Sequence, residues 1–577
     1  MLGSRTSLRL ALGSLAVLWT AALSAGPASA APGLRIMPPD RSTFAVGQRF
    51  DLRVEATGLP EGQADLTVLV NGTPVDQLPG ATVVRGSSAA GAQEVTLRGL
   101  SFASPMDATI TATAKYTGGQ LDANSAFQVL PIAGSGSKAK NVILLIDDGM
   151  GAAHRTAARI VSKGVKFGKF NDLLEMDKMA YHGYVFTPAL NNIWPDSAAA
   201  ISAQAGGNKT DIGALSVWPD DTADTLDNPR YETIAEYLKR TTGKSVGLIS
   251  TAYVADATPA GFLAHTYKRG DYSAIVDQYL SGGVDVLLGG GWKDFLPTAL
   301  NGSRTDGRNQ VDAFKAAGYT YVTTGAEMKA IPTNATKLLG LFTKSNMSVY
   351  VDQVDGRAKG PAAGAEPSLA EMTDAAIKVL SQNPNGFFLM IEDASTDKRA
   401  HVGDANRTVW ETIGGDRALA VAKAFASQAN DTLVIATADH ETGGMAVRNL
   451  GGDPTSLELG WGSMSTKAAV VPVTTAPAKM GEGVAEPTYT DPIGMWGPNK
   501  DAESEHTATE IPLSASGPGS SQFAGPMDET EIFFKMLKAV GGGYTDPAKA
   551  GVPGDMNGDG ALTIQDVVAS LRKVAGL

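Results

Sequence analysis

The stretch NVILLIDDGMG, from Asn141 to Gly151, carries the strongest indication of how this chain folds. Its middle is a continuous run of valine, isoleucine and leucine. Such a run is typical of a strand that is buried on both faces of a parallel sheet. The run ends on two aspartates, Asp147 and Asp148, and then reaches glycines. Because buried carboxylates are costly unless they are paired, this strand end needs a source of positive charge.

Three later apolar runs end on polar side chains in the same way. These side chains are Asp256 and Thr258 in SVGLISTAYVADAT, Glu392, Asp397, Lys398 and His401 in GFFLMIEDASTDKRAH, and Asp439 and His440 in DTLVIATADHE. In open α/β sheets, ligands bind beyond the carboxyl ends of the strands. Carboxylates gathered there would repel one another unless cations held them together. Imidazole with carboxylate suits zinc, and carboxylate with hydroxyl oxygen suits magnesium. The sequence therefore predicts a site for several metal ions.

Local spacing supports this prediction at two places. Asp397 and His401 are four residues apart, which puts both on one face of a helical turn. Asp439 and His440 are adjacent at a strand end, where a turn can direct both to one ion. For any one of these residues, a solvated loop acid or a helix cap is the commoner role. The prediction depends on the pattern shared by all four strands.

The stretch WPDSAAAISAQAGGNKT contains the candidate nucleophile, Ser197. Asp196 and Ser197 precede a run of small residues, as at the start of a helix. An ordinary helix cap by either residue is one interpretation. The other places Ser197 at a helix N-terminus, where backbone N–H groups favour an anion and a metal could lower the pKa of the serine.

Composition limits the classes of fold and function. The chain has 577 residues, of which 43% are hydrophobic and 19% charged, so it is globular and has more than one domain. Its formal charge of −12 disfavours nucleic-acid binding. From residue 141 to 540, apolar strands alternate with helical segments such as 221–243 and 414–430. This region is predicted to be α/β, with a mostly parallel central sheet flanked by helices.

The N-terminal part has a different pattern. Residues 1–30 read as a signal peptide that is cleaved near Ala30, which predicts a secreted or periplasmic protein. A membrane anchor is the alternative, but the apolar run is too short, and no later stretch could span a membrane. Residues 32–132 alternate like strands and contain the hairpin signal Asn71-Gly72, so they predict an immunoglobulin-like β-sandwich. Residues 133–140 read as a flexible linker.

Taken together, several motifs resemble the alkaline phosphatase family, and its bacterial type in particular. They are DGMG (148–151), PDSAAAISAQAGGNKTDIGAL (195–215), DATPAGFLAHTYKR (256–269), LLGLF (338–342), GFFLMIEDASTDKRAH (386–401), TADHETGG (437–444) and EHTATEIPL (505–513). They occur in the family's order and span roughly residues 141–540. The resemblance implies a phosphomonoesterase that acts on small-molecule phosphate esters, and it leaves a homodimer open.

The resemblance also implies a role for each matching residue. Ser197 matches the serine that forms a phosphoseryl intermediate, Arg269 matches the arginine that clamps two phosphate oxygens, and Lys398 matches a residue that reaches phosphate through water. The metal ligands that it implies are Asp397, His401 and His506 for one zinc, Asp148, Asp439 and His440 for a second zinc, and Asp148, Thr258 and Glu392 for a magnesium whose waters Asp256 holds.

Some features depart from the family pattern. Asp147 stands where many members have glycine; its carboxylate could lie near the cluster or face solvent, and we expect the latter. The long segment 442–505 would form a flap over the site. We expect His154, His182 and His265 to be structural.

Two other functions fit parts of the sequence. A phosphodiesterase or sulfatase of the same superfamily would share the metal ligands, but related enzymes of those kinds usually have other nucleophiles. A non-catalytic surface protein would have lost part of the ligand set, and here the set is intact. We therefore expect a phosphomonoesterase.

The C-terminal segment 552–577 contains the calcium-loop pattern DMNGDGALTIQD, with glycine at the sixth position. Its predicted ligands are Asp555, Asn557, Asp559, Thr563 and Asp566. The segment resembles half of a dockerin, a module with two such loops. Because only one loop is visible, docking to a cohesin is not expected, and calcium would instead staple the C-terminus.

We expect the tail to bind calcium, because its loop supplies oxygen ligands at the required spacing. Isothermal titration of the protein with calcium measures this directly. An absence of binding heat from the tail would contradict both the dockerin-like and the staple interpretations.

Overall fold

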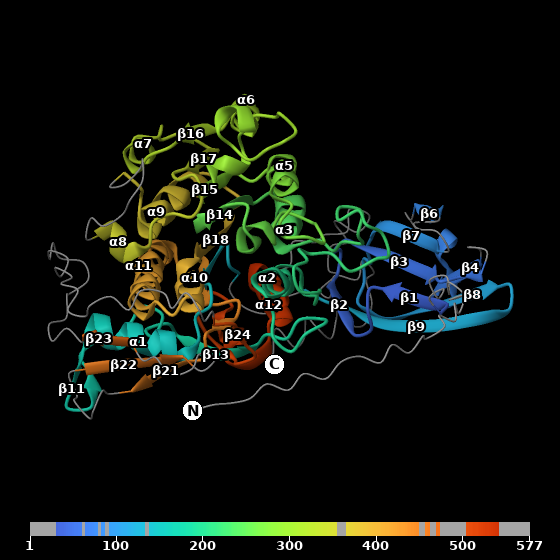
Figure 1. The fold of residues 1–577 in the computed structure, drawn as a ribbon, viewed down its shortest axis with the longest axis horizontal. Coiled ribbons are helices and arrows are strands. Elements are labelled where there is room, and N and C mark those ends of the chain that lie inside the picture. The colour runs from blue at the N-terminus through green and yellow to red at the C-terminus, as the bar shows by residue number, and fades with distance from the viewer. Residues whose placement is uncertain are drawn as a thin grey trace, which may run out of the picture.

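A computed structural model describes residues 31–60, 64–78, 82–86, 92–132, 138–354, 365–448, 456–461, 469–472 and 504–541. The predicted signal peptide, the calcium loop, residues 133–137 of the linker and most of segment 442–505 lie outside these residues. Within the described ranges, no helix is both long and apolar enough to cross a membrane. An N-terminal β-rich part lies beside a larger α/β part (Figure 1).

The α/β part is built on one ten-stranded sheet. In spatial order its strands are β16 (Thr320–Val322), β17 (Leu338–Leu341), β15 (Val286–Gly290), β14 (Ser245–Tyr253), β18 (Phe387–Asp393), β10 (Asn141–Asp147), β19 (Thr432–Thr437), β25 (Ile511–Ser516), β13 (Tyr181–Phe186) and β26 (Gly525–Asp528). Every neighbouring pair is parallel except the two pairs that include β25. The predicted α/β fold with a mostly parallel sheet is confirmed.

Helices cover both faces of this sheet. One group contains α1 (Ala152–Lys163), α8 (Tyr350–Val354), α9 (Leu369–Leu380), α10 (Ser395–His401) and α11 (Ala405–Ala429). The other contains α2 (Ser197–Gly206), α3 (Ile234–Thr242), α4 (Ala257–Ala260) and α12 (Thr530–Val540). The remaining helices are α5 (Tyr272–Gly282), α6 (Gln310–Ala316) and α7 (Gly325–Lys329). Because both faces are covered, the central strands are buried at every residue, as their apolar runs predict.

Short strand pairs and a small sheet complete this part. They are β11 (Val165–Lys166) with β12 (Lys169–Phe170), β20 (Glu441–Thr442) with β24 (His506–Thr507), and β21 (Met445–Arg448), β22 (Ser456–Trp461) and β23 (Ala469–Pro472). The pair of β20 and β24 brings the two ends of segment 442–505 together.

Two helical segments differ from their predicted bounds. Within 221–243, the helix α3 begins only after Thr233, whose side chain forms a capping box with Glu236. Pro229 lies in the strand-like segment that precedes this cap, where Val217 bridges Arg230. The helix within 414–430 is instead longer than predicted, since α11 starts after the cap Asp404.

The β-rich part contains two sheets around one core. The first consists of β1 (Gly33–Met37), β3 (Phe50–Thr57), β7 (Gln93–Leu100) and β6 (Val83–Gly86), and the second of β2 (Ser42–Ala45), β9 (Gly119–Leu130), β8 (Met106–Tyr116), β4 (Asp65–Val70) and β5 (Thr73–Pro74). Asn71 and Gly72 form the tight turn between β4 and β5, both with positive φ, as the hairpin signal predicts. The core of these two sheets includes Trp218 and Tyr231, which belong to the α/β part.

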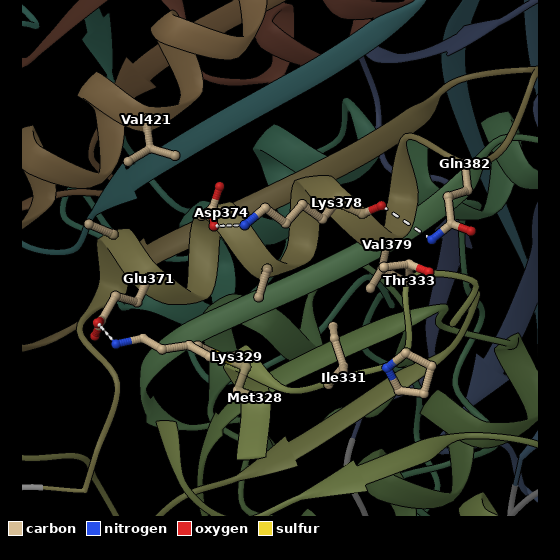
Figure 2. Close-up of a pocket in the computed structure, with 13 residues that line it drawn as sticks. Met328, Lys329, Ile331, Thr333, Glu371, Asp374, Lys378, Val379, Gln382 and Val421 are labelled. Atoms are coloured by element: carbon tan, nitrogen blue, oxygen red, sulfur yellow. Dashed lines mark hydrogen bonds and ion pairs between the residues drawn. The ribbon is translucent and has the colours of Figure 1, made fainter. Parts of the chain in front are cut away.

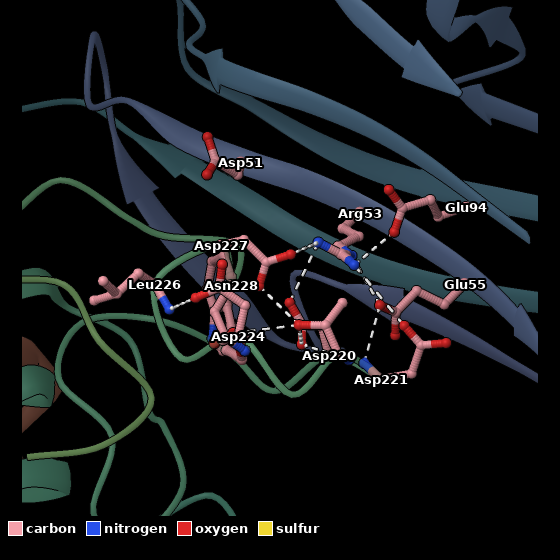
Figure 3. A network of polar contacts seen from close by, with 12 residues as sticks. Asp51, Arg53, Glu55, Glu94, Asp220, Asp221, Asp224, Leu226, Asp227 and Asn228 are labelled. Atoms are coloured by element: carbon pink, nitrogen blue, oxygen red, sulfur yellow. Dashed lines mark hydrogen bonds and ion pairs between the residues drawn. The ribbon is translucent and has the colours of Figure 1, made fainter. Parts of the chain in front are cut away.

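A buried arginine joins the two parts (Figure 3). Arg53 on β3 is 2% exposed, and its guanidinium lies 2.8 Å from Glu55, 2.5 Å from Glu94 and 3.2 Å from Asp220. Asp220 comes from the loop that follows α2, so this ion-pair network fixes that loop against the β-rich part. Such a network is costly to break, because the loss of one charge leaves its buried partners uncompensated.

Candidate active site

Three neighbouring strands of the central sheet end on buried carboxylates. Asp148 follows β10, Glu392 lies at the end of β18, and Asp439 follows β19; all three are at most 2% exposed. Asp397, on α10 directly after β18, is also buried. Parallel strands with adjacent register deliver these groups to one edge, as the repeated sequence pattern predicts.

The turn after β10 requires glycine. Gly149 has a φ of +80°, and a Cβ atom there would lie 2.8 Å from both Cα and Cβ of Asp397. Its backbone N–H donates to Asp439 at 3.2 Å. The turn can therefore bring Asp148 close to the other carboxylates only because position 149 has no side chain.

Three side chains form a first group of converging donors. His401 Nε2 lies 3.2 Å from Asp397 Oδ1 and 3.0 Å from His506 Nε2, and His506 Nε2 lies 3.4 Å from Asp397 Oδ1. Nδ1 of His401 donates to the Ser504 carbonyl at 2.5 Å, and Nδ1 of His506 donates to the Pro195 carbonyl at 2.8 Å. These bonds leave both Nε2 atoms free to coordinate a cation.

A second group lies beside the first. His440 Nε2 is 3.2 Å from Asp439 Oδ2 and 3.6 Å from Asp148 Oδ1, and all three residues are fully or almost fully buried. Both of these carboxylate oxygens lack a hydrogen-bond donor. The imidazoles of His440 and His506 stack with ring centroids 3.6 Å apart, so the two groups are contiguous. Buried oxygens without donors around one point fit a divalent cation.

A third region contains the predicted magnesium ligands. The Ser250 hydroxyl donates to Glu392 Oε2, Thr258 lies close enough to lower the pKa of Glu392, and Glu392 Oε1 has no hydrogen-bond partner. Asp256 lies beside this region and accepts hydrogen bonds from Lys398 Nζ at 2.9 Å and from Arg269 at 3.0 Å. One carboxylate therefore holds both of the cations that the sequence assigned to phosphate.

The predicted nucleophile starts a buried helix. Ser197 is the first residue of α2, and Asp196 caps the helix by accepting from the Ala199 N–H at 3.0 Å. The Ser197 hydroxyl lies 3.2 Å from His440 Nε2, which places it at the second donor group. Arg269 donates to the other oxygen of Asp196 at 2.9 Å. The cap interpretation thus holds for Asp196, while Ser197 points into the cluster.

The electrostatics of the cluster favour bound cations. Burial, followed by the nearby Asp439 and Asp397, raises the pKa of Asp148 well above its usual range. Burial likewise raises the pKa of Glu392 to about 7 and lowers the pKa of His440 well below its usual value. These shifts all reflect the cost of charge in a dry site. Divalent cations would reverse that cost and favour ionised carboxylates with neutral imidazoles.

The prediction that Asp147 faces solvent is wrong. Asp147 is 0% exposed, and burial raises its pKa to about 8. It is the last residue of a central strand whose two faces are both covered, so neither side of the strand reaches water. Its carboxylate lies with that of Asp393 over Gly415 of α11, where a Cβ atom would be 3.4 Å and 3.0 Å from them. Asp147 therefore faces away from the donor groups, toward the helix α11.

Three histidines lie outside the donor groups. His154 is fully buried and accepts from the Gly151 N–H through Nδ1, His182 contacts the Ser514 hydroxyl, and His265 lies 3.0 Å from Glu236. The sequence analysis missed Thr442, which donates to Asp397 at 2.5 Å, and Ser250. A hydroxyl residue gives no distinctive spacing, so only the register that pairs Ser250 with Glu392 identifies it.

A surface groove lies apart from the donor groups (Figure 2). Met328, Ile331 and Pro332 line one side, and Ala375 and Val379 of α9 line the other. It contains none of the predicted site residues. The chemistry therefore belongs to the sheet edge and not to this groove.

Comparisons with known proteins agree on one family. The model of the protein family named Alkaline phosphatase matches residues 139–541 of this chain. The chain is 31% identical over 462 residues to alkaline phosphatase H of Pseudomonas aeruginosa (strain UCBPP-PA14), which covers 74% of this chain and 90% of that protein. It is 32% identical over 447 residues to alkaline phosphatase of Escherichia coli (strain K12), which covers 70% and 87%.

A solved structure gives the same result for the fold. A variant of the alkaline phosphatase TAB5, with Mg bound in its M3 site, superposes with a TM-score of 0.52 at 26% identity. The match covers 70% of this chain and 98% of that chain. The likeness supports metal cofactors. The family model begins at residue 139, after the β-rich part.

We expect His506→Ala to reduce the bound metal by about one ion per chain, because it removes one of three converging donors. Elemental analysis after dialysis measures the metal content. His182→Ala is the matched control, because His182 contacts the Ser514 hydroxyl and lies outside the donor groups. An unchanged metal content in a folded His506→Ala protein would exclude His506 as a ligand.

Proposed function

This chain belongs to the alkaline phosphatase family, and from that membership we propose how its own residues hydrolyse a phosphate monoester. The proposed route is covalent: the Ser197 hydroxyl oxygen attacks phosphorus, the bond to the alcohol breaks, and water then hydrolyses the phosphoserine. The observation that carries this proposal is the 3.2 Å separation of Ser197 Oγ from His440 Nε2, at the start of a buried helix.

The proposed cofactors are two zinc ions and one magnesium ion. Asp397, His401 and His506 would hold one zinc, Asp148, Asp439 and His440 the other, and Asp148, Thr258 and Glu392 the magnesium. When bound, these ions would lower the pKa values of serine and water and neutralise charge on the entering and leaving oxygens. The mixture of imidazole and carboxylate donors in the first two groups, and of hydroxyl and carboxylate in the third, supports this division.

Arg269 is proposed to clamp two phosphate oxygens. Its two terminal nitrogens each donate to a different carboxylate, Asp196 and Asp256, which fixes the plane of the guanidinium. Each of these nitrogens carries a second N–H, so the pair can bind two further oxygens in parallel. Lys398 is fixed by Asp256 in the same way and supplies a point charge nearby.

The backbone at the start of α2 would add to this stabilisation. The first N–H groups of a helix have no intrahelical acceptor, and the helix dipole favours negative charge there. Asp196 occupies one of them, the Ala199 N–H. Charge that develops on the equatorial oxygens during transfer would be stabilised by the others and by Arg269.

We also propose roles for the segments on either side of the catalytic part. We propose that residues 1–30 direct export to the periplasm or the exterior and that residues 32–132 are an immunoglobulin-like β-sandwich domain. We also propose that segment 552–577 binds calcium. A homodimer is proposed from the family resemblance, and docking to a cohesin is not.

Comparing substrates tests the proposed activity. We expect an aryl phosphate to turn over about a hundredfold faster than an aryl phosphate diester or an aryl sulfate, because a phosphate monoester carries two negative charges for the cations of the site and the other two esters carry one. A chelator should abolish this turnover, and zinc with magnesium should restore it. Faster turnover of the diester or the sulfate would instead support the sister activities.

Replacing the nucleophile tests the covalent route. We expect Ser197→Ala to lower kcat by about a thousandfold or more, since removal of a nucleophile usually costs at least that much. Its metal content should stay unchanged, because serine is not among the three donors of either zinc. Ser162→Ala, in α1, is the control, because the Ser162 hydroxyl donates only within its own helix to the Ala158 carbonyl at 2.7 Å, and it should retain kcat within about threefold. Full turnover by Ser197→Ala would exclude a phosphoserine intermediate.

A further inference from the structure

The helix that carries Ser197 consists mostly of small residues. All ten residues of α2 are buried, and its sequence SAAAISAQAG is dominated by alanine, glycine and serine. Helices are held against sliding by ridges that fit into grooves, and small residues make shallow ridges. Two side chains within α2 also hold it, because Ser202 donates to the Ala214 carbonyl at 3.3 Å and Gln204 donates to the Ala438 carbonyl at 2.9 Å. The position of α2 along its own axis depends on these bonds together with what holds its two ends.

The N-terminal end is held within the α/β part. Asp196 accepts from Ala199 of the helix and from the Gly213 N–H, both at 3.0 Å, and Arg269 donates to its second oxygen. These contacts fix the first turn of α2 at the site itself. They do not reach the opposite end of the helix.

The C-terminal end is held by the β-rich part. The amide nitrogen of Gln48 donates to the carbonyl of Gly206, the last residue of α2, at 2.9 Å, and to the carbonyl of Glu232 at 2.8 Å. Its amide oxygen accepts from the Ala45 N–H at 2.9 Å. Gln48 is 0% exposed, so no water competes for these bonds. Carbonyls at a helix end have no intrahelical donor, and for Gly206 Gln48 supplies the shorter of two, the other being Asn208 Nδ2 at 3.3 Å.

Neighbouring contacts keep Gln48 itself in place. Asn208 exchanges two hydrogen bonds with the backbone of Thr43, at 3.1 Å and 2.7 Å. Tyr237 donates to the Val46 carbonyl at 3.0 Å, and Arg240 donates to the Gly47 carbonyl at 2.9 Å. The segment 43–48 is therefore fixed on both sides of Gln48, and it can serve as a rigid stop for α2.

The two ends of α2 are mechanically linked. Ten helical residues span about 15 Å, and a helix of this length moves as a rigid rod. A shift of its C-terminal end along the axis is therefore transmitted to Ser197. Misplacing a reacting group by about 1 Å can cost about a hundredfold in rate.

We propose that Gln48 is a positioning residue, which sets the distance between Ser197 and the donor groups by holding the opposite end of α2. This inference rests on the proposed role of Ser197 as nucleophile. It assigns the N-terminal β-rich part a role in the reaction, although the family model does not include that part.

The test compares Gln48→Met with two controls in the full-length protein. Methionine keeps the length and volume of glutamine but donates no hydrogen bond. Ser125→Ala removes a buried bond within the β-rich part, from the Ser125 hydroxyl to the Pro38 carbonyl at 2.8 Å. Arg98→Met removes a bond across the junction, from the Arg98 guanidinium to the Asn228 carbonyl at 3.0 Å, that contacts neither α2 nor the segment 43–48.

The first readout is amide hydrogen exchange of the peptide that covers 197–206, and it requires no activity. We expect Gln48→Met to speed exchange in the last turn of α2 by about tenfold, and neither control to change it by more than about twofold. If α2 exchanges as in the parent protein, the inference is wrong, whether or not the proposed function is right.

The second readout is turnover of an aryl phosphate, expressed per folded and metal-loaded chain. Circular dichroism at the assay temperature and elemental analysis give that fraction. We expect kcat of Gln48→Met to fall by about threefold to thirtyfold. Inhibition by inorganic phosphate should change by less than about threefold, because Arg269 is also held by Asp256.

The controls separate positioning from general stability. Ser125→Ala and Arg98→Met should keep the parent kcat even where they lower the thermal midpoint as much as Gln48→Met does. An unchanged kcat in Gln48→Met, or an equal loss in all three variants, would overturn the inference. If Gln48→Met does not fold, Gln48→Asn keeps the amide but shortens its reach, and the same outcomes are expected.

Discussion

The repulsion between buried carboxylates is the constraint on which the rest of this structure depends. Three strands and one short helix bring acidic side chains to one edge of the sheet, into a space that burial closes to water. Such an arrangement is stable only if positive charge lies among the acids. The chain supplies two cations of its own, Lys398 and Arg269, but both are engaged with Asp256. Metal ions, which the likeness to a magnesium-bound alkaline phosphatase supports, would balance the remaining negative charge.

This constraint also explains how substrate charge is accommodated. Asp256 holds the cations Lys398 and Arg269 in fixed directions, and its negative charge offsets the repulsion between them. The cations then face the same edge as the start of α2. A phosphoryl group is an anion, and its contacts with Lys398 and Arg269 would replace part of the hydration that these side chains lose on burial. The same contacts would therefore bind the substrate and balance its charge. The site is organised before substrate arrives, which is the arrangement that phosphoryl transfer needs.

Sequence patterns predicted those parts of the molecule that depend on local geometry. The buried strand runs, the spacing of Asp397 and His401 on one helical turn, and the Asn71-Gly72 hairpin each follow from a short stretch of chain. The environment of Asp147 does not, because it depends on α11, which lies far along the sequence and covers the second face of β10. The start of α3 was also misjudged, because tertiary contacts keep the segment before Thr233 extended. The hydrogen bond from Gln48 to Gly206 could not be predicted, because no local pattern around either residue indicates the other.

The junction between the two parts shows why a boundary in sequence is not always a boundary in the core. The β-rich part includes two aromatic side chains of the α/β part, Trp218 and Tyr231, within its own hydrophobic cluster. Tyr231 packs directly over the end of α2, where a Cβ atom on Gly206 would lie 2.3 Å from its ring. These aromatics cannot be withdrawn without opening the core between the two N-terminal sheets on one side and the support of α2 on the other. The two parts are therefore expected to unfold together near this junction, since each supplies apolar surface that the other needs to bury. The β-rich part packs around Tyr231, and Tyr231 contacts the same end of α2 to which the amide of Gln48 donates.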